Sequence, residues 1–177
     1  LAFPQYDGLF PSVAGTEMEK VRVNGQEVSR SKGWKTLYFG NSNRNPFNAW
    51  QSSREAPFHI LDMSWTAYLM LIWHEELEAD QRLVDYARRH ADRLITLQNA
   101  DGFFPAWLDQ KTQEPLPYLN ASPETSMSVT FLLKLYQTTR DQRYLDAAKR
   151  ALDAVVRNVV PTGQWEDFET YWSCSRI

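Results

Sequence analysis

The stretch Asp62–Leu77 reads DMSWTAYLMLIWHEEL, and its apolar side chains fall on every side of a helix rather than along one stripe. A helix that is apolar all round belongs inside a larger assembly. The stretch is too short, and too interrupted by Ser64 and Thr66, to span a bilayer. The next stretch, 80–98, separates an apolar face from a charged face and is typical of an amphipathic outer helix. The two stretches together predict a helical hairpin.

The same pattern returns later in the chain. Laying residues 62–105 over 124–166 with one gap aligns ten identical residues, among them Ser64 with Ser126 and Gly102 with Gly163. A repeat that pairs one buried helix with one amphipathic helix is typical of stacked helical hairpins. We therefore expect Trp73 and Leu133 inside, Arg89 and Arg150 in solvent, inner helices over 61–77 and 124–138, and outer helices over 80–99 and 141–160.

The composition limits the classes of protein to which this chain can belong. The 177 residues have the length of one domain, and a hydrophobic content of 43% supports a real core. A net charge of −3 gives no basic footprint for nucleic acid or lipid, so we expect neither partner. The single Cys174 excludes an internal disulfide framework, and no histidine or cysteine cluster predicts a metal or cofactor. No apolar leader is present, and two hairpins leave the inner helices poorly covered, which predicts a piece of a longer protein or a chain completed by a partner.

Residues 1–57 do not share the helical period and form a separate lead-in to the hairpin region, 58–177. Their first part is punctuated by proline and glycine and predicts irregular structure. Around Asn24-Gly25 the chain alternates in hydrophobicity, which predicts a β-hairpin. Residues 33–40 could form another short strand. The polar loop 41–53 either crosses the surface or contacts a polyhydroxylated ligand.

Geometry then selects candidate site residues. In an array of hairpins all inner helices run in the same direction, so their N-termini and the loops that return from the outer helices meet on one face. The carboxylates expected there as catalytic groups are Asp62, Glu124, Glu166, Asp167 and Glu169. The side chains expected to bind substrate are His59, Trp65, Phe104, Trp107, Trp165, Tyr171 and Trp172. Carboxylates among aromatic rings suit glycoside chemistry, because one acid protonates the leaving oxygen and another activates water or attacks.

A structural interpretation stands beside this one. Asp62 and Glu124 each lie at a helix start, where a negative charge is favoured by roughly 0.3–1 kcal/mol without any chemistry. The acidic cluster 166–169 is denser than a helix start requires. His59 is the kind of histidine that packs or caps a helix, and the sequence gives the other two histidines, His74 and His90, no special role. Cys174 has no histidine near it in sequence that would activate it as a nucleophile.

Hairpins of this period, with aromatic and acidic loops at the inner-helix starts, resemble the (α/α) toroids over roughly residues 58–177. The six-hairpin glycosidases and related polysaccharide lyases are the sugar-processing members. The stretch LQNADGFFPAW, 97–107, is also similar to loops of terpene cyclases and prenyltransferase subunits, but the aspartate-rich motifs of those enzymes are missing. No motif of any of these families matches residue by residue, so the resemblance carries over no catalytic assignment.

The toroid resemblance implies an all-α enzyme fragment that acts on an oligo- or polysaccharide, with a glycoside hydrolase as the first expectation. In a polysaccharide lyase, Tyr171 or His59 would abstract a proton while Arg54 or an asparagine neutralises a uronate. A third possibility is a helical-repeat module that binds a glycan or peptide without catalysis. Expected partners are the substrate and the rest of the toroid or a second chain, without nucleic acid or membrane. A sugar substrate favours a secreted or periplasmic protein; the sugar, linkage and stereochemistry are not readable.

Overall fold

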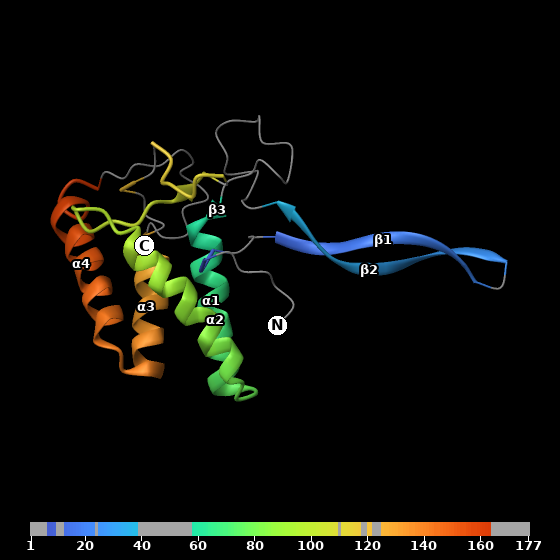
Figure 1. Cartoon of the computed structure of the whole chain (residues 1–177). Coiled ribbons are helices and arrows are strands. Elements are labelled where there is room, and N and C mark those ends of the chain that lie inside the picture. The colour runs from blue at the N-terminus through green and yellow to red at the C-terminus, as the bar shows by residue number, and fades with distance from the viewer. Residues whose placement is uncertain are drawn as a thin grey trace.

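The computed structural model describes residues 7–9, 13–23, 25–38, 58–109, 111–117, 120–121 and 125–163. In this part of the chain four α-helices form a bundle, and a long two-stranded ribbon projects from its side (Figure 1). The elements in chain order are β1 (Val13–Val23), β2 (Gln26–Tyr38), β3 (Phe58–His59), α1 (Ile60–Glu76), α2 (Gln81–Thr96), β4 (Trp107–Leu108), α3 (Thr125–Thr139) and α4 (Gln142–Asn158).

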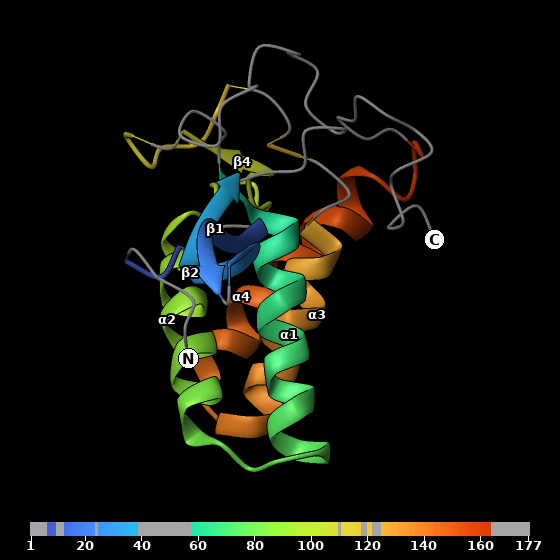
Figure 2. The same ribbon diagram turned by 90° about the vertical axis from the view of Figure 1, so that its right-hand side faces the viewer.

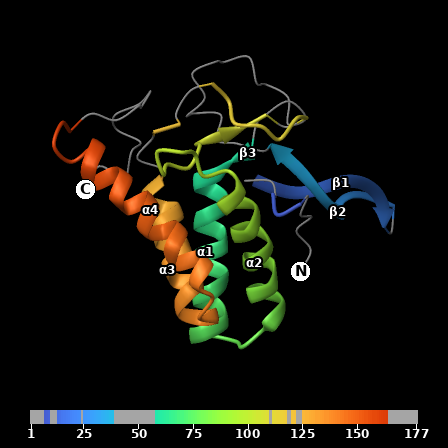
Figure 3. The same cartoon turned by 60° about the vertical axis from the view of Figure 1, so that its left-hand side comes forward.

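The helices form two hairpins that stand side by side. α1 packs against α2 and α3, and α3 packs against α4, so α1 and α3 lie between the outer helices along the contact of the two hairpins (Figure 3). The expected inner helices are confirmed to within one residue at each end, and both outer helices are confirmed with shorter C-terminal ends. Arg89 and Arg150 are exposed, as expected for the charged faces of amphipathic helices.

The core consists of apolar side chains from all four helices. α4 buries Ala147, Ala148, Ala151 and Ala154, which lets it approach α3 closely, and α3 buries the larger Phe131. One expectation about burial is wrong: Trp73 is 51% exposed, and Leu133 is only half-buried. An all-round apolar helix does not reveal which of its sides has a neighbour. Among the described residues, no helix covers the side of α1 that carries Trp73.

An aspartate N-cap begins each outer helix, α2 and α4. The Asp80 side chain accepts from the backbone N–H of Arg82 at 2.9 Å, and that of Asp141 accepts from the backbone N–H of Arg143 at 3.0 Å. The guanidinium of each arginine also forms an ion pair with the carboxylate that caps the helix. These hydrogen bonds lower the pKa of Asp80 to about 2 and also lower that of Asp141.

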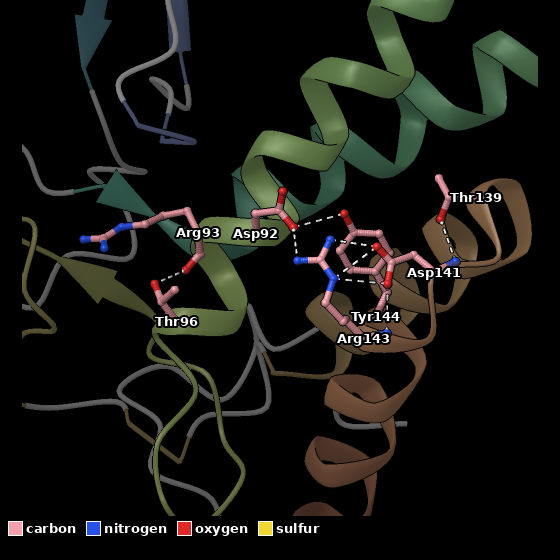
Figure 4. Close-up of polar contacts among 7 residues, drawn as sticks. All are labelled: Asp92, Arg93, Thr96, Thr139, Asp141, Arg143 and Tyr144. Atoms are coloured by element: carbon pink, nitrogen blue, oxygen red, sulfur yellow. Dashed lines mark hydrogen bonds and ion pairs between the residues drawn. The ribbon is translucent and has the colours of Figure 1, made fainter.

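At the second hairpin this cap is tied to α2 (Figure 4). Arg143 places Nη1 3.3 Å from Asp92 Oδ1, and the Tyr144 hydroxyl donates to the same oxygen at 3.1 Å. Burial and the Asp92 carboxylate together raise the pKa of Tyr144 to about 12. The cap of α4 therefore also joins the two hairpins through one carboxylate.

Replacing Asp141 with alanine should lower the free energy of unfolding by about 1 kcal/mol, because an N-cap is lost and Arg143 loses its carboxylate partner. Asp146→Ala is the matched control, since Asp146 is an exposed carboxylate on α4 that accepts a hydrogen bond from the Gln142 side chain at 2.8 Å. Urea titrations of both variants measure the difference. Equal stability of the two variants would contradict a capping role for Asp141.

The lead-in contains the expected β-hairpin. Val23 pairs with Gln26 around Asn24-Gly25, and Gly25 has φ +82°, which a two-residue hairpin turn of this kind requires. The strand expected at 33–40 is present over Gly33 to Tyr38, but it continues β2 and pairs with β1 rather than forming a separate strand. Two register shifts in β1, at Val13/Ala14 and Glu17/Met18, accommodate the extra residues of β2.

Candidate site at the N-terminal ends of the inner helices

The N-termini of α1 and α3 lie at the same end of the bundle, beneath the connection between the two hairpins (Figure 2). β3 leads directly into α1 and pairs with β4 of this connection, and the Ile60 N–H donates to Ala106 O at 2.9 Å. Thr125, the first residue of α3, accepts the Phe104 N–H at 3.1 Å and donates its hydroxyl to Phe104 O at 3.2 Å. One segment thus binds both helix starts, and the expected convergence of these ends is confirmed.

The connection is held in place by its own hydrogen bonds. The Asn99 side chain accepts the Phe103 N–H at 2.9 Å, and the Gly102 N–H donates to Asn99 O at 3.0 Å. Gln98 extends from the end of α2 and donates to Gly102 O at 2.9 Å and to Ala147 O of α4 at 3.0 Å. The segment therefore packs on the second hairpin as a fixed turn.

A histidine and a carboxylate meet at the start of α1. The His59 ring is fully buried and stacks on Trp107, with ring centroids 4.0 Å apart and an interplanar angle of 13°. His59 Nδ1 lies 2.8 Å from Asp62 Oδ2, while the Asp62 side chain keeps 26% of its surface exposed. The histidine thus lies within ion-pair distance of a carboxylate that still reaches solvent. Such a group can accept a proton or hold a cationic partner.

The other residues predicted for the site lie in three situations. Trp65 is 50% exposed on α1, one turn from Asp62, and its ring lies 6.1 Å from that of Tyr68. Phe104 and Trp107 are buried and pack inside the chain, and their role in substrate binding stays a prediction. The remaining predicted residues lie outside the described part of the chain: Glu124, Trp165, Glu166, Asp167, Glu169, Tyr171 and Trp172.

The sequence interpretation missed the role of His90. This fully buried residue places Nδ1 3.0 Å from Gly8 O and Nε2 3.4 Å from Ser64 Oγ, which lies 3.2 Å from Ser128 Oγ. Because a carbonyl only accepts, Nδ1 carries the proton and Nε2 accepts from the Ser64 hydroxyl. Burial lowers the pKa of His90 to about 4, opposed by the hydrogen bond to Gly8. The available signal was the position of a histidine on the apolar face of α2.

This polar chain connects four parts of the molecule. It runs from α3 through α1 and α2 to the segment 7–9, which lies 82 residues from His90 in sequence. Within the described residues no three His, Cys, Asp or Glu side chains gather in a way that could hold a metal ion. None of the described helices is long and apolar enough to cross a membrane.

Comparison with known proteins gives a likeness of fold. No protein-family model matches the chain, and no curated protein sequence matches it. Among solved structures, the chain is similar to the Lin0763 protein from Listeria innocua, with a TM-score of 0.52 and 16% identity. The match covers 64% of this chain and 33% of that protein, so the chain matches about a third of the neighbour's length. At this identity the likeness extends to the fold alone.

Proposed function

We propose that this chain is part of an (α/α)-toroid glycoside hydrolase whose site lies at the N-terminal ends of the inner helices. The observation that carries the proposal is the carboxylate of Asp62. It lies 2.8 Å from His59 Nδ1 and remains partly exposed where two inner-helix starts and their connecting segment meet. Asp62 is the catalytic carboxylate of the described part. His59 is a positioning residue, because it is buried and acts through Asp62.

The proposed reaction requires a second acid across the scissile bond. One carboxyl group protonates the leaving oxygen while the other activates water or attacks the sugar carbon. The candidates for this second group are Glu124 and the acidic cluster Glu166, Asp167 and Glu169. Trp65 lies one helical turn from Asp62, half-exposed, and offers a ring on which a sugar face can stack. The toroid supplies the remaining walls of the site.

The test uses the complete toroid and a panel of oligosaccharides, with release of reducing ends as the readout. We expect Asp62→Asn, and at least one of Glu166→Gln, Asp167→Asn and Glu169→Gln, to lower kcat by at least about 100-fold with little change in Tm, because a proton-transfer group acts on the transition state. Asp146→Asn is the matched control, since this exposed carboxylate lies near the start of α4, at the opposite end of the bundle from the N-termini of α1 and α3.

Each alternative has its own outcome in the same assay. Products with a new carbon–carbon double bond and no consumption of water would identify a polysaccharide lyase. Saturable binding of a glycan or peptide without turnover would identify a binding module. Full activity in the Asp62→Asn variant, or loss of activity only through unfolding, would contradict the role proposed for Asp62.

A further inference from the structure

A ridge of large apolar side chains runs along one side of α1. Trp65, Leu69 and Trp73 follow one another at intervals of four residues and are 50%, 47% and 51% exposed. Side chains four apart are neighbours on a helix, so the three form one continuous surface. Figure 2 looks onto α1 from the side opposite to α4. Contiguous exposed apolar surface of this kind marks a contact with another protein element.

The repeat shows which element this ridge fits. In the alignment of the two hairpins, Leu69 and Trp73 occupy the positions of Phe131 and Leu135 on α3. Both α3 residues are fully buried, and the Phe131 ring centroid lies 5.4 Å from that of His90 on the preceding hairpin. Phe131 is therefore buried against the preceding hairpin at the position where α1 exposes Leu69, and Leu135 is buried at the position where α1 exposes Trp73.

Polar contacts give the same register. α3 reaches back to α1 through Ser128, which lies 3.2 Å from Ser64, and through Lys134, which lies 2.5 Å from Glu75. The α1 counterparts of these two α3 residues are Thr66 and Ile72. They lie three residues before and three residues after Leu69, and so flank it on the helix surface. The ridge side of α1 is thus equivalent to the side by which α3 joins α1.

A second, independent observation concerns the segment before β1. The sequence DGLFP at 7–11 repeats DGFFP at 101–105, with four of five residues identical. Gly8 has φ +79° and approaches Arg89 O and Arg93 Cβ of α2 so closely that a Cβ would clash. Gly102 has φ +102°, and a Cβ on it would lie 2.7 Å from Arg150 O and 3.1 Å from Ala154 Cβ of α4.

The contacts of the two glycines are equivalent, because the repeat aligns Arg89 with Arg150 and Arg93 with Ala154. Gly102 belongs to the turn that leaves α2 and crosses to the following hairpin. Gly8 crosses to α2 in the same way, and Leu9, like Phe103, is buried beside it. The segment 7–9 therefore has the geometry of the exit from an outer helix.

We propose that the Trp65–Leu69–Trp73 ridge binds a helical hairpin of the same repeat, for which the segment 7–9 is the exit from the outer helix. Its inner helix would lie on α1 as α1 lies on α3, continuing the interface between the two described hairpins. The segment 7–9 fixes the exit of the outer helix on α2 through the His90–Gly8 hydrogen bond. This inference rests on packing and is independent of the proposed reaction.

The test adds such a hairpin to the chain. A copy of residues 60–100 replaces residues 1–6 and is joined to Asp7, so that the junction reads ITLQNA-DGLFP and keeps the turn of the native ITLQNA-DGFFP sequence. We expect the extended chain to remain monomeric and to have a Tm about 5 °C or more above that of the original chain. Its α1 amides should also exchange hydrogen more slowly. Leu69→Glu should lower Tm by less than about 2 °C in the original chain and by about 5 °C or more in the extended one.

The matched control is Val156→Glu, which places the same charge at a side chain 51% exposed on α4. It should have the same small effect in both chains. An extended chain with unchanged Tm and α1 exchange, or an equal effect of Leu69→Glu in both chains, would overturn the proposal. A stable dimer of the original chain that Leu69→Glu disrupts would also overturn it, because the ridge would then bind a second copy.

Discussion

Replacing Gly102 with alanine should lower the free energy of unfolding by about 2–5 kcal/mol. The residue has φ +102°, where an L-residue costs about 1–3 kcal/mol, and its new Cβ would lie 2.7 Å from the backbone oxygen of Arg150. Overpacking of this kind costs about 1–3 kcal/mol more, since backbone on both sides must shift. Gly8→Ala should be comparably destabilising, because a Cβ there meets the backbone oxygen of Arg89.

Gly163 supplies the matched control. It also has a positive φ, +62°, but a Cβ on it would have nothing within 4 Å. Gly163→Ala should therefore lose only the conformational preference of glycine, about 1 kcal/mol. Denaturant unfolding of the three variants measures both contributions. If Gly102→Ala is no more destabilising than Gly163→Ala, the close packing of the turn on α4 is wrong.

Acid should destabilise the folded chain through His90. Its pKa is lowered to about 4 in the folded state by burial, against an ordinary value of 6.5. Between these two values the unfolded chain binds a proton that the folded chain does not, so the free energy of unfolding falls as pH falls. The contribution of neutral His90 to the free energy of unfolding is fully present above pH 6.5, and about 3 kcal/mol of it is lost by pH 4.

The variant His90→Gln should remove this part of the pH dependence, because glutamine can still donate to Gly8 O and accept from Ser64 without titrating. His74→Gln is the matched control: His74 is half-buried and contacts Asp80 O at 2.9 Å at the other end of the helices. Urea titrations at several pH values between 4 and 7 provide the measurement. An unchanged pH slope in His90→Gln would show that other groups cause the acid sensitivity.

The helices could be predicted because their signals are local. Apolar residues located α1 and α3, the separation of apolar and charged faces located α2 and α4, and Asn24-Gly25 marked the hairpin turn. These features depend on residues within a few positions of one another. The common end of the inner helices followed from their parallel direction in a hairpin array.

The remaining features depend on contacts that sequence spacing does not reveal. The exposure of Trp73 depends on which side of α1 has a neighbour, and the role of His90 depends on a segment far away in the chain. The continuation of β2 through Gly33 depends on register shifts in its partner strand. At the candidate site, Asp62 lies at a helix start and His59 is packed, as the structural interpretation expected, but the stacking of His59 on Trp107 joins residues far apart in sequence.

The most direct test of the proposed function is a crystal structure of the complete protein with a bound oligosaccharide, using the Asp62→Asn variant to prevent turnover. We predict that the sugar lies across the N-terminal ends of α1 and α3, with one sugar ring stacked on Trp65. The side chain of residue 62 should lie within hydrogen-bond distance of a glycosidic oxygen or of a water molecule next to the anomeric carbon. An oligosaccharide bound at the opposite end of the helices or along the β1–β2 ribbon, with the inner-helix starts empty, would contradict the proposal.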